Sequence, residues 1–402
     1  MYKVKKLDLV ILAGGKGSRI SKLQKKLPKP MIKFNNIPFL QYQINNFFKY
    51  PFENCYILSG YKGIIIHKKF NNKKFNLIKI KNIKEKKPMG TGGALRNLKN
   101  RLKNDFILIN GDTIFDVDLS NIFTSKKFSK NLITIFLTDN KNYKSNSKLT
   151  NLKIGNKNLI QFNLKSKLMN GGIYLCKNKI LNLIHKKVFS FEDEILINLI
   201  NNKRVNGIYK KNYFIDIGTP ENLKKGFYEI PKYFNRPAAF LDRDGVINHD
   251  FGYVHKFKNF KFRKGIISAL RYLVKNNYYI FIITNQAGIG KKKFTELDFL
   301  ILQKKIIYKL LKKKIFINDL QYCPYHPKAL IKKYRKKSNM RKPNNGMIKN
   351  IFNNWNIIIK ESFFVGDNEK DMLAAKKSNI YFEYAKKKPL LQFKNILTYL
   401  KK

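Results

Sequence analysis

Two carboxylates separated by a single residue follow a short apolar run in the second half of the chain. Asp242 and Asp244 come directly after the run 238–241, within the string FLDRDGVIN. Neighbouring acids can divide the work of a phosphoryl transfer, because one can attack phosphorus while the other protonates the leaving oxygen and then activates water. Isolated pairs of this spacing are usually ordinary surface residues, so the pair needs partners.

Polar residues also stand at the ends of later apolar runs in this half. They are Thr284 and Asn285 after the run 279–283, and Asp367 and Asp371 after the run 362–365, and between them in the chain Arg341 and Lys342 precede Pro343. If these runs are parallel strands, their carboxyl ends meet at one edge of the sheet, where ligands bind in such folds. The ordered set therefore predicts one shared site at that edge.

The first half begins with a glycine-rich turn that could hold a phosphate chain. The run 7–12 leads into AGGKGSR, where Gly14, Gly15 and Gly17 allow backbone N–H groups to face phosphate oxygens. Arg19 adds a bidentate phosphate donor. Many strand ends turn on glycine, so this loop is weak evidence by itself.

Further motifs follow in order along the first half. They are Lys29 in LPKPM, Gly90 and Gly92 in PMGTGGA, Asp112 in NGD, Asn170 and Gly171 in NGGIY, and Asp216 in FIDIGTP. PMGTGGA is a second glycine turn that opens a predicted helix and suits a flat base lying against backbone. NGD ends an apolar run with a carboxylate.

Short apolar runs alternate with longer amphipathic ones, which is typical of parallel α/β domains. The expected strands are 7–12, 55–58, 106–109, 238–241, 279–283 and 362–365, and the expected helices are 39–48, 93–102, 265–276, 295–313 and 369–377. Thr295 followed by Asp298 predicts an N-cap. Pro231 and Pro237 bracket a polar segment, so we expect domains at 1–230 and 238–402 joined by a linker at 231–237.

The chain is strongly basic, with 83 Lys and Arg against 25 Asp and Glu among 402 residues. A nucleic-acid partner would explain a net charge of +58. The basic residues are spread along the whole chain, however, and no nucleic-acid-binding motif is visible. We therefore favour compositional drift, together with polyanionic substrates whose association the basic field accelerates.

Cysteine usage and hydropathy indicate a cytoplasmic protein without a membrane anchor. Cys55, Cys176 and Cys323 have irregular spacing, which suggests no disulfide framework and fits a reducing compartment. No apolar stretch reaches the roughly 18 residues that a membrane helix needs. We interpret the basic and apolar start of the chain as a buried strand and not as a signal peptide, because Asp8 interrupts it and the glycine loop follows.

Together the motifs of residues 5–229 resemble those of sugar-1-phosphate nucleotidyltransferases. The strings NGDTIFDVDL, NGGIYL and YFIDIGTPEN are most similar to D-glycero-D-manno-heptose 1-phosphate guanylyltransferases. The resemblance implies that a sugar phosphate attacks the α-phosphorus of a nucleoside triphosphate and expels pyrophosphate. It assigns Gly14, Gly15, Gly17, Arg19 and Lys29 to the triphosphate, Gly90 and Gly92 to the base, Asp112 and Asp216 to Mg²⁺, and Lys165, Asn170 and Gly171 to the sugar phosphate. The family commonly has Glu before this Lys, whereas this chain has Leu164, so a sugar-hydroxyl contact is missing there.

The order of acids, Thr and Lys in residues 236–402 resembles the haloacid dehalogenase phosphatases. By this resemblance Asp242 is the nucleophile and Asp244 the acid and base, while Thr284 and Lys342 stabilise the phosphoryl group. Mg²⁺ would be held by Asp242, the Asp244 carbonyl and Asp367, with Asp371 in support. Asn285 and Arg341 would contact substrate.

The strings TNQAGIG, CPYHP and RKPNNGM are similar to those of D-glycero-D-manno-heptose 1,7-bisphosphate 7-phosphatases, with histidinol phosphatases as close relatives. Those enzymes commonly carry a structural zinc. Here Tyr325, Ser338 and Met340 replace three of its ligands, and Cys323 with His326 cannot close a tetrahedral site. We therefore expect no zinc, and a loop 322–340 that is held by packing or is mobile.

The two resemblances imply an α/β protein with two Rossmann-like domains, an N-terminal mixed sheet and a C-terminal haloacid dehalogenase-type parallel sheet with a minimal cap. The expected function is bifunctional GDP-heptose biosynthesis from GTP and sugar phosphates, for lipopolysaccharide, S-layer or capsule. Another hexose phosphate, or histidinol phosphate for the phosphatase, is the nearer alternative. An RNA-binding pseudo-enzyme is the more distant one. The nucleobase, sugar, anomer and oligomeric state stay open from sequence.

Overall fold

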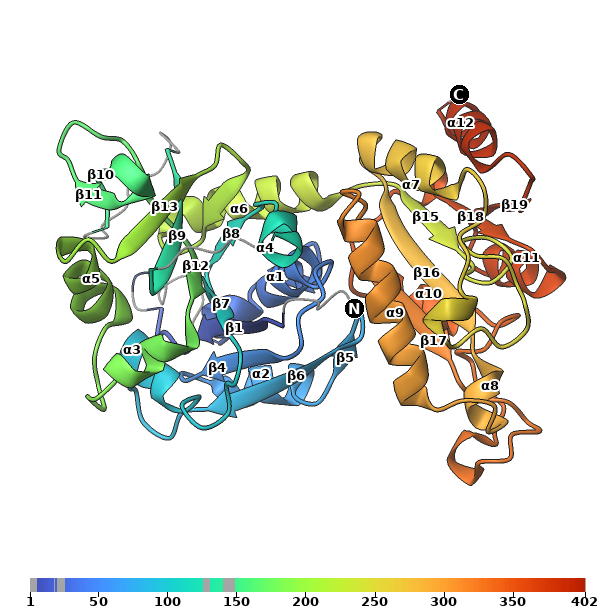
Figure 1. The fold of residues 1–402 in the computed structure, drawn as a ribbon, viewed down its shortest axis with the longest axis horizontal. Coiled ribbons are helices and arrows are strands. Elements are labelled where there is room, and N and C mark those ends of the chain that lie inside the picture. The colour runs from blue at the N-terminus through green and yellow to red at the C-terminus, as the bar shows by residue number, and fades with distance from the viewer. Residues whose placement is uncertain (1–5, 18, 20–25, 126–130, 140–148, 402) are drawn as a thin grey trace. The chain divides into compact units, whose positions relative to one another are not determined.

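The computed structural model describes residues 6–17, 19, 26–125, 131–139 and 149–401. These residues form two compact units, each with its own sheet (Figure 1). The first unit contains Met1–Ile44, Phe52–Lys74 and Ile78–Glu229, and the second contains Asn45–Pro51, Phe75–Leu77 and Ile230–Lys402. In the described part of the chain, no helix is both long enough and apolar enough to cross a membrane.

An eight-stranded mixed sheet forms the centre of the first unit (Figure 1). Its strands, in spatial order, are β13 (Val205–Tyr209), β9 (Ile133–Thr138), β12 (Met169–Cys176), β7 (Phe106–Asn110), β1 (Asp8–Ala13), β4 (Cys55–Ser59), β6 (Ile78–Lys84) and β5 (Lys74–Phe75). Strand β1 runs parallel to β4 and β7, whereas β12 is antiparallel to β7 and β9. The glycine loop after β1 and the NGD motif after β7 therefore emerge at the same edge.

Small ribbons and short helices complete the first unit. The ribbons are β2 (Lys33–Phe34) with β3 (Ile37–Pro38), β8 (Thr113–Phe115) with β14 (Phe214–Asp216), and β10 (Leu152–Ile154) with β11 (Ile160–Phe162). The helices are α1 (Phe39–Phe47), α2 (Gly63–Phe70), α3 (Gly90–Arg96), α4 (Ser120–Thr124) and α5 (Ile197–Asn201), with a π-helical turn η5 (Phe191–Leu196) before α5. The β8–β14 pairing brings Asp216 opposite Thr113, next to Asp112.

A five-stranded parallel sheet forms the centre of the second unit. Its strands, in spatial order, are β17 (Asp319–Cys323), β16 (Tyr279–Asn285), β15 (Ala238–Leu241), β18 (Phe363–Gly366) and β19 (Tyr381–Tyr384). Its helices are α7 (Ile266–Lys275), α8 (Ala287–Gly290), α9 (Glu296–Leu311), α10 (Gly346–Phe352), α11 (Glu369–Lys376) and α12 (Pro389–Leu400). Strand β15 is fully buried at the centre, as its apolar sequence requires.

The observed sheets confirm the predicted α/β class, with one mixed sheet and one parallel sheet. Strand β15 has the predicted bounds, and Thr295 and Asp298 form a reciprocal capping box at the start of α9. The predicted helix 93–102 was wrong in its bounds, because α3 begins at Gly90 and ends at Arg96. Beyond it the backbone N–H groups of Asn97 and Leu98 bond three residues back, which tightens the chain into turns.

Helix α6 (Pro220–Phe234) extends into the segment that the sequence assigned to a linker. Pro231 lies inside this helix, and strand β15 begins at Ala238. Only residues 235–237 separate the two elements. Strand β1 begins at Asp8, whereas residues 1–5 of the predicted buried start lie outside the described residues.

Candidate active sites

The centre of the C-terminal site is a buried lysine between two buried carboxylates. Lys342 Nζ lies 3.0 Å from Asp242 Oδ1 and 2.5 Å from Asp371 Oδ1, and it also donates to the Ile283 carbonyl at 2.9 Å. Asp242 follows β15 directly, and its N–H bonds the Val365 carbonyl of β18. Lys342 and Asp371 are 2% and 0% exposed. Lys342 therefore neutralises part of the negative charge of Asp242 and Asp371 within the protein itself.

The electrostatics of this cluster favour a partly protonated Asp242 and a charged Lys342. Burial raises the pKa of Asp242 to about 7, Asp371 and Asp244 add to the rise, and Lys342 opposes it. Burial acts to lower the pKa of Lys342, but Asp242 and Asp371 outweigh it and the pKa is raised. Lys342 is therefore cationic at neutral pH.

Asp244 is held in a different environment from Asp242. Arg243 contacts both of its carboxylate oxygens, with Nη2 to Oδ2 at 2.6 Å. Asn248 donates to Oδ1 at 2.9 Å and Gln286 donates to Oδ2 at 3.2 Å. The Arg243 side chain is itself buried, so it holds Asp244 in a fixed position. Two carboxylates with such different surroundings can take different roles in one reaction.

A carboxylate cluster beside the lysine is suited to a hard cation. Ligand oxygens of Asp242, Asp367 and Asp371 all lie within 4.8 Å of one another, and this is the one such cluster in the described part of the chain. Gly245 lies against it with φ +78°, and a Cβ there would come within 1.9 Å of Asp367 Oδ2. An all-oxygen donor set of this kind fits Mg²⁺.

These groups open into a cavity of about 310 Å³. Its lining includes Asp242, Asp244, Thr284, Asn285, Arg341, Lys342 and Asp367 from the residues predicted for catalysis, substrate or metal, whereas the buried Asp371, predicted as a supporting carboxylate, does not line it. Asp250, Tyr253 and Lys370 also line it. Tyr253 belongs to the string GYV, which is part of the phosphatase resemblance but was given no role, and no motif distinguishes Asp250 or Lys370. Asn285 bonds both the backbone N–H and the carbonyl of Lys342, each at 3.1 Å, which ties β16 to the Arg-Lys-Pro segment.

The loop that lacks the zinc ligands is held by a carboxylate and two phenols. Glu296, in the first turn of α9, accepts hydrogen bonds from Tyr322 and from Tyr334, the latter at 3.0 Å. Arg341 Nη1 donates to the Tyr325 carbonyl at 3.4 Å, and the Tyr325 and Tyr334 rings lie 6.0 Å apart. We call Glu296, Tyr322 and Tyr334 the tyrosine clamp. It gives the loop a metal-free attachment to the domain.

The N-terminal site brings together Lys29, Asp112 and Asp216. Lys29 Nζ lies 3.4 Å from both Asp112 Oδ2 and the Gly218 carbonyl. The Ile217 N–H bonds the Asp112 carbonyl at 2.9 Å, and the Gly218 N–H bonds Asp216 Oδ1 at 2.5 Å. Two carboxylates from distant motifs thus share one location, as the sequence predicted for a metal pair.

Asp216 is the perturbed acid of this site. Burial raises its pKa to about 7, with Asp112 adding to the rise, while the Gly218 N–H, Lys29 and Arg19 oppose it. Arg19 is exposed, and its influence on Asp216 places the phosphate-loop arginine near the carboxylates. Neighbouring Ser18 lies outside the described residues.

Glycines of the first loop lie against a carboxylate that the sequence reasoning missed. A Cβ at Gly14 would come within 2.9 Å of Glu85 Oε1, and Gly17 packs on the Lys29 side chain with φ +66°. Gly15 has open space around it. Glu85 Oε2 accepts the Met89 N–H at 3.3 Å, and burial raises the pKa of Glu85. Glu85 therefore stands between the phosphate loop and the second glycine turn.

Packing alone explains why the second glycine turn contains glycine at Gly90 and Gly92. A Cβ at Gly90 would lie 2.4 Å from the Phe189 carbonyl, and one at Gly92 would lie 2.1 Å from the Phe189 ring. The Gly92 N–H also bonds the Phe189 carbonyl at 3.0 Å. Glycine at these positions is therefore required by residue 189, whether or not a base binds beside the turn.

The residues predicted to bind the sugar phosphate differ in how they are held in the fold. Asn170, on β12, donates to the Tyr174 hydroxyl at 2.6 Å, and Gly171 packs on the Phe115 ring. Lys165 is exposed, and its backbone N–H bonds Asn163 Oδ1. Leu164 beside it is 91% exposed. Lys165 is thus on the surface, whereas Asn170 and Gly171 are packed within the fold.

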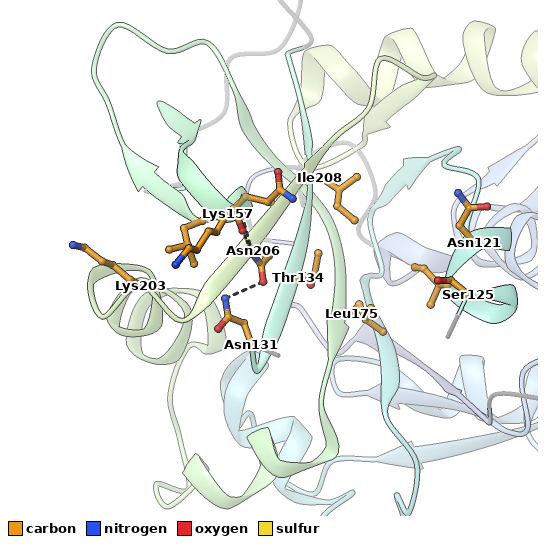
Figure 2. A pocket seen from close by; sticks show the side chains of 13 residues that line it. Asn121, Ser125, Asn131, Thr134, Lys157, Leu175, Lys203, Asn206 and Ile208 are labelled. Carbon is orange, nitrogen blue, oxygen red and sulfur yellow. Dashed lines mark hydrogen bonds between the residues drawn. The ribbon is translucent and has the colours of Figure 1, made fainter. Parts of the chain in front are cut away.

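A separate cavity of about 630 Å³ lies between α4, β9 and β13 and contains none of the predicted residues (Figure 2). Asn206 dominates its polar lining and donates to the Lys157 and Asn158 carbonyls, while it accepts from Asn131. Its amide is therefore satisfied within the fold, and none of the described residues that line this cavity is a carboxylate.

Comparison with known proteins matches each half of the chain to one family. Residues 9–232 match the family model described as Nucleotidyl transferase, and residues 241–388 match the one described as Polynucleotide kinase 3 phosphatase. D-glycero-beta-D-manno-heptose-1,7-bisphosphate 7-phosphatase of Escherichia coli (strain K12) is 40% identical over 144 residues, covering 36% of this chain and 75% of that protein. Its counterpart from Rhodopseudomonas palustris (strain ATCC BAA-98 / CGA009) is 39% identical over 145 residues, covering 36% and 81%.

Solved structures match the same two halves. HddC from Yersinia pseudotuberculosis is 27% identical and covers 56% of this chain and 99% of its own, with a TM-score of 0.46. D,D-heptose 1.7-bisphosphate phosphatase from B. bronchiseptica, complexed with magnesium and phosphate, is 23% identical and covers 37% and 78%, with a TM-score of 0.33. The chain therefore has a transferase half and a phosphatase half: it belongs to the nucleotidyl transferase family and, through its C-terminal part, to the D-glycero-beta-D-manno-heptose-1,7-bisphosphate 7-phosphatases.

Proposed function

We propose that the chain carries out two consecutive steps of nucleotide-heptose biosynthesis. The C-terminal half removes the phosphate at position 7 of D-glycero-D-manno-heptose 1,7-bisphosphate, and the N-terminal half transfers guanylyl from GTP to the resulting heptose 1-phosphate. One observation carries the proposal. The part of the chain that is 40% identical to a curated 7-phosphatase is the part in which Asp242, Asp244 and Lys342 line one cavity.

In the phosphatase reaction, Asp242 is the nucleophile. One of its carboxylate oxygens bonds to phosphorus while the bond from phosphorus to the sugar oxygen breaks, and Asp244 gives that oxygen a proton. Water then attacks the phosphorus of the aspartyl-phosphate and gives its proton to Asp244, so that phosphate leaves and Asp242 is restored. Lys342 and Thr284 stabilise the transferring group, and Arg243 keeps Asp244 within reach.

In the transferase reaction, an oxygen of the sugar phosphate bonds to the α-phosphorus of GTP while the bond to pyrophosphate breaks. This step needs alignment and charge neutralisation more than covalent help. Gly14, Gly15 and Gly17 present backbone N–H groups to the triphosphate, and Arg19 and Lys29 add positive charge. Gly90 and Gly92 border the base, and Lys165, Asn170 and Gly171 contact the sugar phosphate.

Mg²⁺ fits the donor sets of both halves. Asp242, Asp367 and the Asp244 carbonyl would hold it in the phosphatase, and Asp112 with Asp216 would hold it in the transferase. When bound, the cation supplies positive charge that offsets the phosphate oxygens and lets the raised-pKa carboxylates ionise. Zinc has no part in the proposal.

Glu85 supports guanine as the base. Its carboxylate lies between Gly14 of the phosphate loop and Met89, at the start of the glycine turn assigned to the base. A carboxylate only accepts hydrogen bonds, and guanine offers two adjacent N–H donors on one edge, from N1 and the 2-amino group. Uracil and thymine offer one such donor, so a carboxylate here favours GTP.

The product of the phosphatase is the acceptor of the transferase, which gives one chain a reason to carry both. Both halves use phosphorylated intracellular metabolites, and the three cysteines are free and buried, which supports a cytoplasmic location.

The test supplies heptose 1,7-bisphosphate and Mg²⁺ with each of the four nucleoside triphosphates in turn, and identifies products by mass. We expect one phosphate released per heptose in every reaction, and GDP-heptose with pyrophosphate in the GTP reaction. Release of the 1-phosphate, or transfer that is as efficient from UTP as from GTP, would overturn the corresponding half of the proposal. Mannose 1-phosphate is the matched control acceptor.

A further inference from the structure

Glu192 lies in the N-terminal domain outside every motif that the sequence distinguished. It belongs to the π-helical turn η5, whose first turn is capped by Ser190 accepting the Asp193 N–H at 3.1 Å. Single π-helical turns are rare and occur frequently at functional sites. A carboxylate presented from such a turn therefore calls for an explanation.

One oxygen of Glu192 is the centre of a polar network. Oε1 accepts hydrogen bonds from the Tyr174 hydroxyl at 2.5 Å, from Asn170 at 3.2 Å and from Asn110 at 3.3 Å. Tyr174 is fully buried, and its pKa is raised well above the usual value by burial and by Glu192, so its hydroxyl stays a donor. These three donors fix the direction of the carboxylate.

The second carboxylate oxygen of Glu192, Oε2, is available to accept a hydrogen bond from a ligand. Among the described residues no protein group donates a hydrogen bond to it, and the residue is only partly buried. A carboxylate oxygen held in a fixed direction without a protein partner is a ready acceptor for a ligand hydroxyl.

The surroundings of Glu192 place this oxygen among the transferase motifs. The Phe191 N–H bonds Thr91 Oγ1 of the second glycine turn at 2.9 Å. Asn110 stands two residues before Asp112 on the chain, and Asn170 belongs to the NGG motif. Glu192 thus connects the base turn, the carboxylate pair and the sugar-phosphate strand.

Two other roles fit the geometry less well. Glu192 is not part of any cluster of three potential metal ligands in the described part of the chain, although Asp112 and Asp216 lie in the same domain. A purely structural role would use both carboxylate oxygens, whereas the protein uses one. The position before Lys165 carries Leu164, whose exposed apolar side chain cannot bind a hydroxyl.

We propose that Glu192 is a specificity-determining residue of the transferase, whose Oε2 accepts a hydrogen bond from a hydroxyl of the sugar phosphate. The inference rests on the proposed transferase function. It names the residue that supplies the acidic sugar contact which position 164 lacks.

The sharpest test is Glu192→Gln, because glutamine keeps one oxygen for the three donors and replaces only the outward oxygen with an amide. We expect the KM for heptose 1-phosphate to rise about ten- to a hundredfold, as for loss of a charged hydrogen bond, while the KM for GTP stays the same. Tyr174→Phe removes the strongest orienting donor and should move the same constant less. Glu194→Gln is the matched control, since Glu194 is on the same turn but pairs with exposed Lys186.

Mono-deoxy heptose 1-phosphates then identify the hydroxyl. The analogue that lacks it should show the raised KM with the wild-type protein and no further rise with Glu192→Gln. An unchanged KM for heptose 1-phosphate in a folded Glu192→Gln protein would overturn the inference alone, as would a parallel rise in the KM for GTP. A wild-type protein that converts neither heptose nor mannose 1-phosphate would overturn the proposed function and this inference with it.

Discussion

The two candidate sites solve the same electrostatic problem in different ways. Asp216 in the first unit and Asp242 in the second both have a pKa raised to about 7, and burial is the main cause for each. Asp242 has a buried lysine 3.0 Å away, whereas Asp112 of the transferase pair lies 3.4 Å from Lys29, which is less deeply buried. The buried Lys342 neutralises part of the carboxylate charge in the phosphatase, and the less deeply buried Lys29 pairs with Asp112 in the transferase.

This difference follows from the chemistry proposed for each half. A covalent nucleophile must be aimed at phosphorus before the substrate arrives, so Asp242 and Asp244 are fixed by buried partners. A nucleotidyl transfer has no covalent intermediate on the protein and mainly needs two ligands aligned.

The largest expected effect is a reciprocal loss of activity. Asp242→Asn removes the nucleophile and should lower phosphate release from heptose bisphosphate by a factor of about 10³ or more, on the scale of losing 4 kcal/mol or more from the barrier. Transfer to ready-made heptose 1-phosphate should stay within about twofold. Asp216→Asn should give the reverse pattern, because it removes half of the carboxylate pair in the other unit.

Phosphate release and GDP-heptose formation, measured separately on each variant, decide the matter. Asp298→Asn, at the exposed start of α9, is the control for changing an acid to an amide outside both sites. If either variant abolishes both activities while the protein stays folded, the claim of two separable sites is wrong.

The phosphatase residues were predictable because each follows a strand of a parallel sheet. Once β15, β16 and β18 were placed, their carboxyl ends had to meet, and Asp242, Thr284 and Asp367 had to meet with them. Lys342 follows no strand, and only the family pattern assigned it. Arg243 was missed although it stands between the two acids, because sequence cannot tell whether a side chain there points into the site.

The transferase side was less predictable because its contacts come from distant turns. Glu192 meets Asn110 across 82 positions of the chain, and Glu85 reaches Gly14 through packing that no local pattern encodes. One signal was available. In a chain with only 25 acids among 402 residues, the local concentration of acids in SFEDEIL is unusual enough to merit a role.

The second largest expected effect is a loss of stability, and it differs between substitution of Lys342 and substitution of Lys29. Lys342→Met would leave Asp242 and Asp371 buried without their counter-ion, and we expect a loss of about 3 kcal/mol in the unfolding free energy of the second unit. Lys29→Met removes a longer, partly exposed pair and should cost about 1 kcal/mol or less in the first unit.

The single tryptophan allows unfolding of the second unit to be measured separately. Trp355 belongs to the second unit and packs on Tyr279 and Phe281, so its fluorescence follows that unit in denaturant. Circular dichroism follows both units. Equal losses from the two substitutions would contradict the view that the buried Lys342 pairs contribute more to stability than the more exposed Lys29 pair.

The smallest expected effect tests how each site anchors its substrate-side cation. Arg341 is attached through Tyr325 to the tyrosine clamp, whereas the turn carrying Lys165 is exposed. Glu296→Gln leaves one oxygen for two phenols, so it should cost about 1–2 kcal/mol of stability. It should also raise the KM for heptose bisphosphate severalfold with little change in kcat, because Arg341 is displaced and Asp242 is not.

Asp298→Asn provides the matched comparison, since it weakens the cap of the same helix without touching the clamp. It should cost about 1 kcal/mol and leave the KM unchanged. A zinc-selective chelator should not alter the unfolding of the wild-type protein if the tyrosine clamp is what attaches the loop. If the chelator lowers stability, or if Glu296→Gln leaves both stability and KM unchanged, then the loop is held by groups other than Glu296 and its two tyrosines, and the contrast with the exposed Lys165 turn needs another cause.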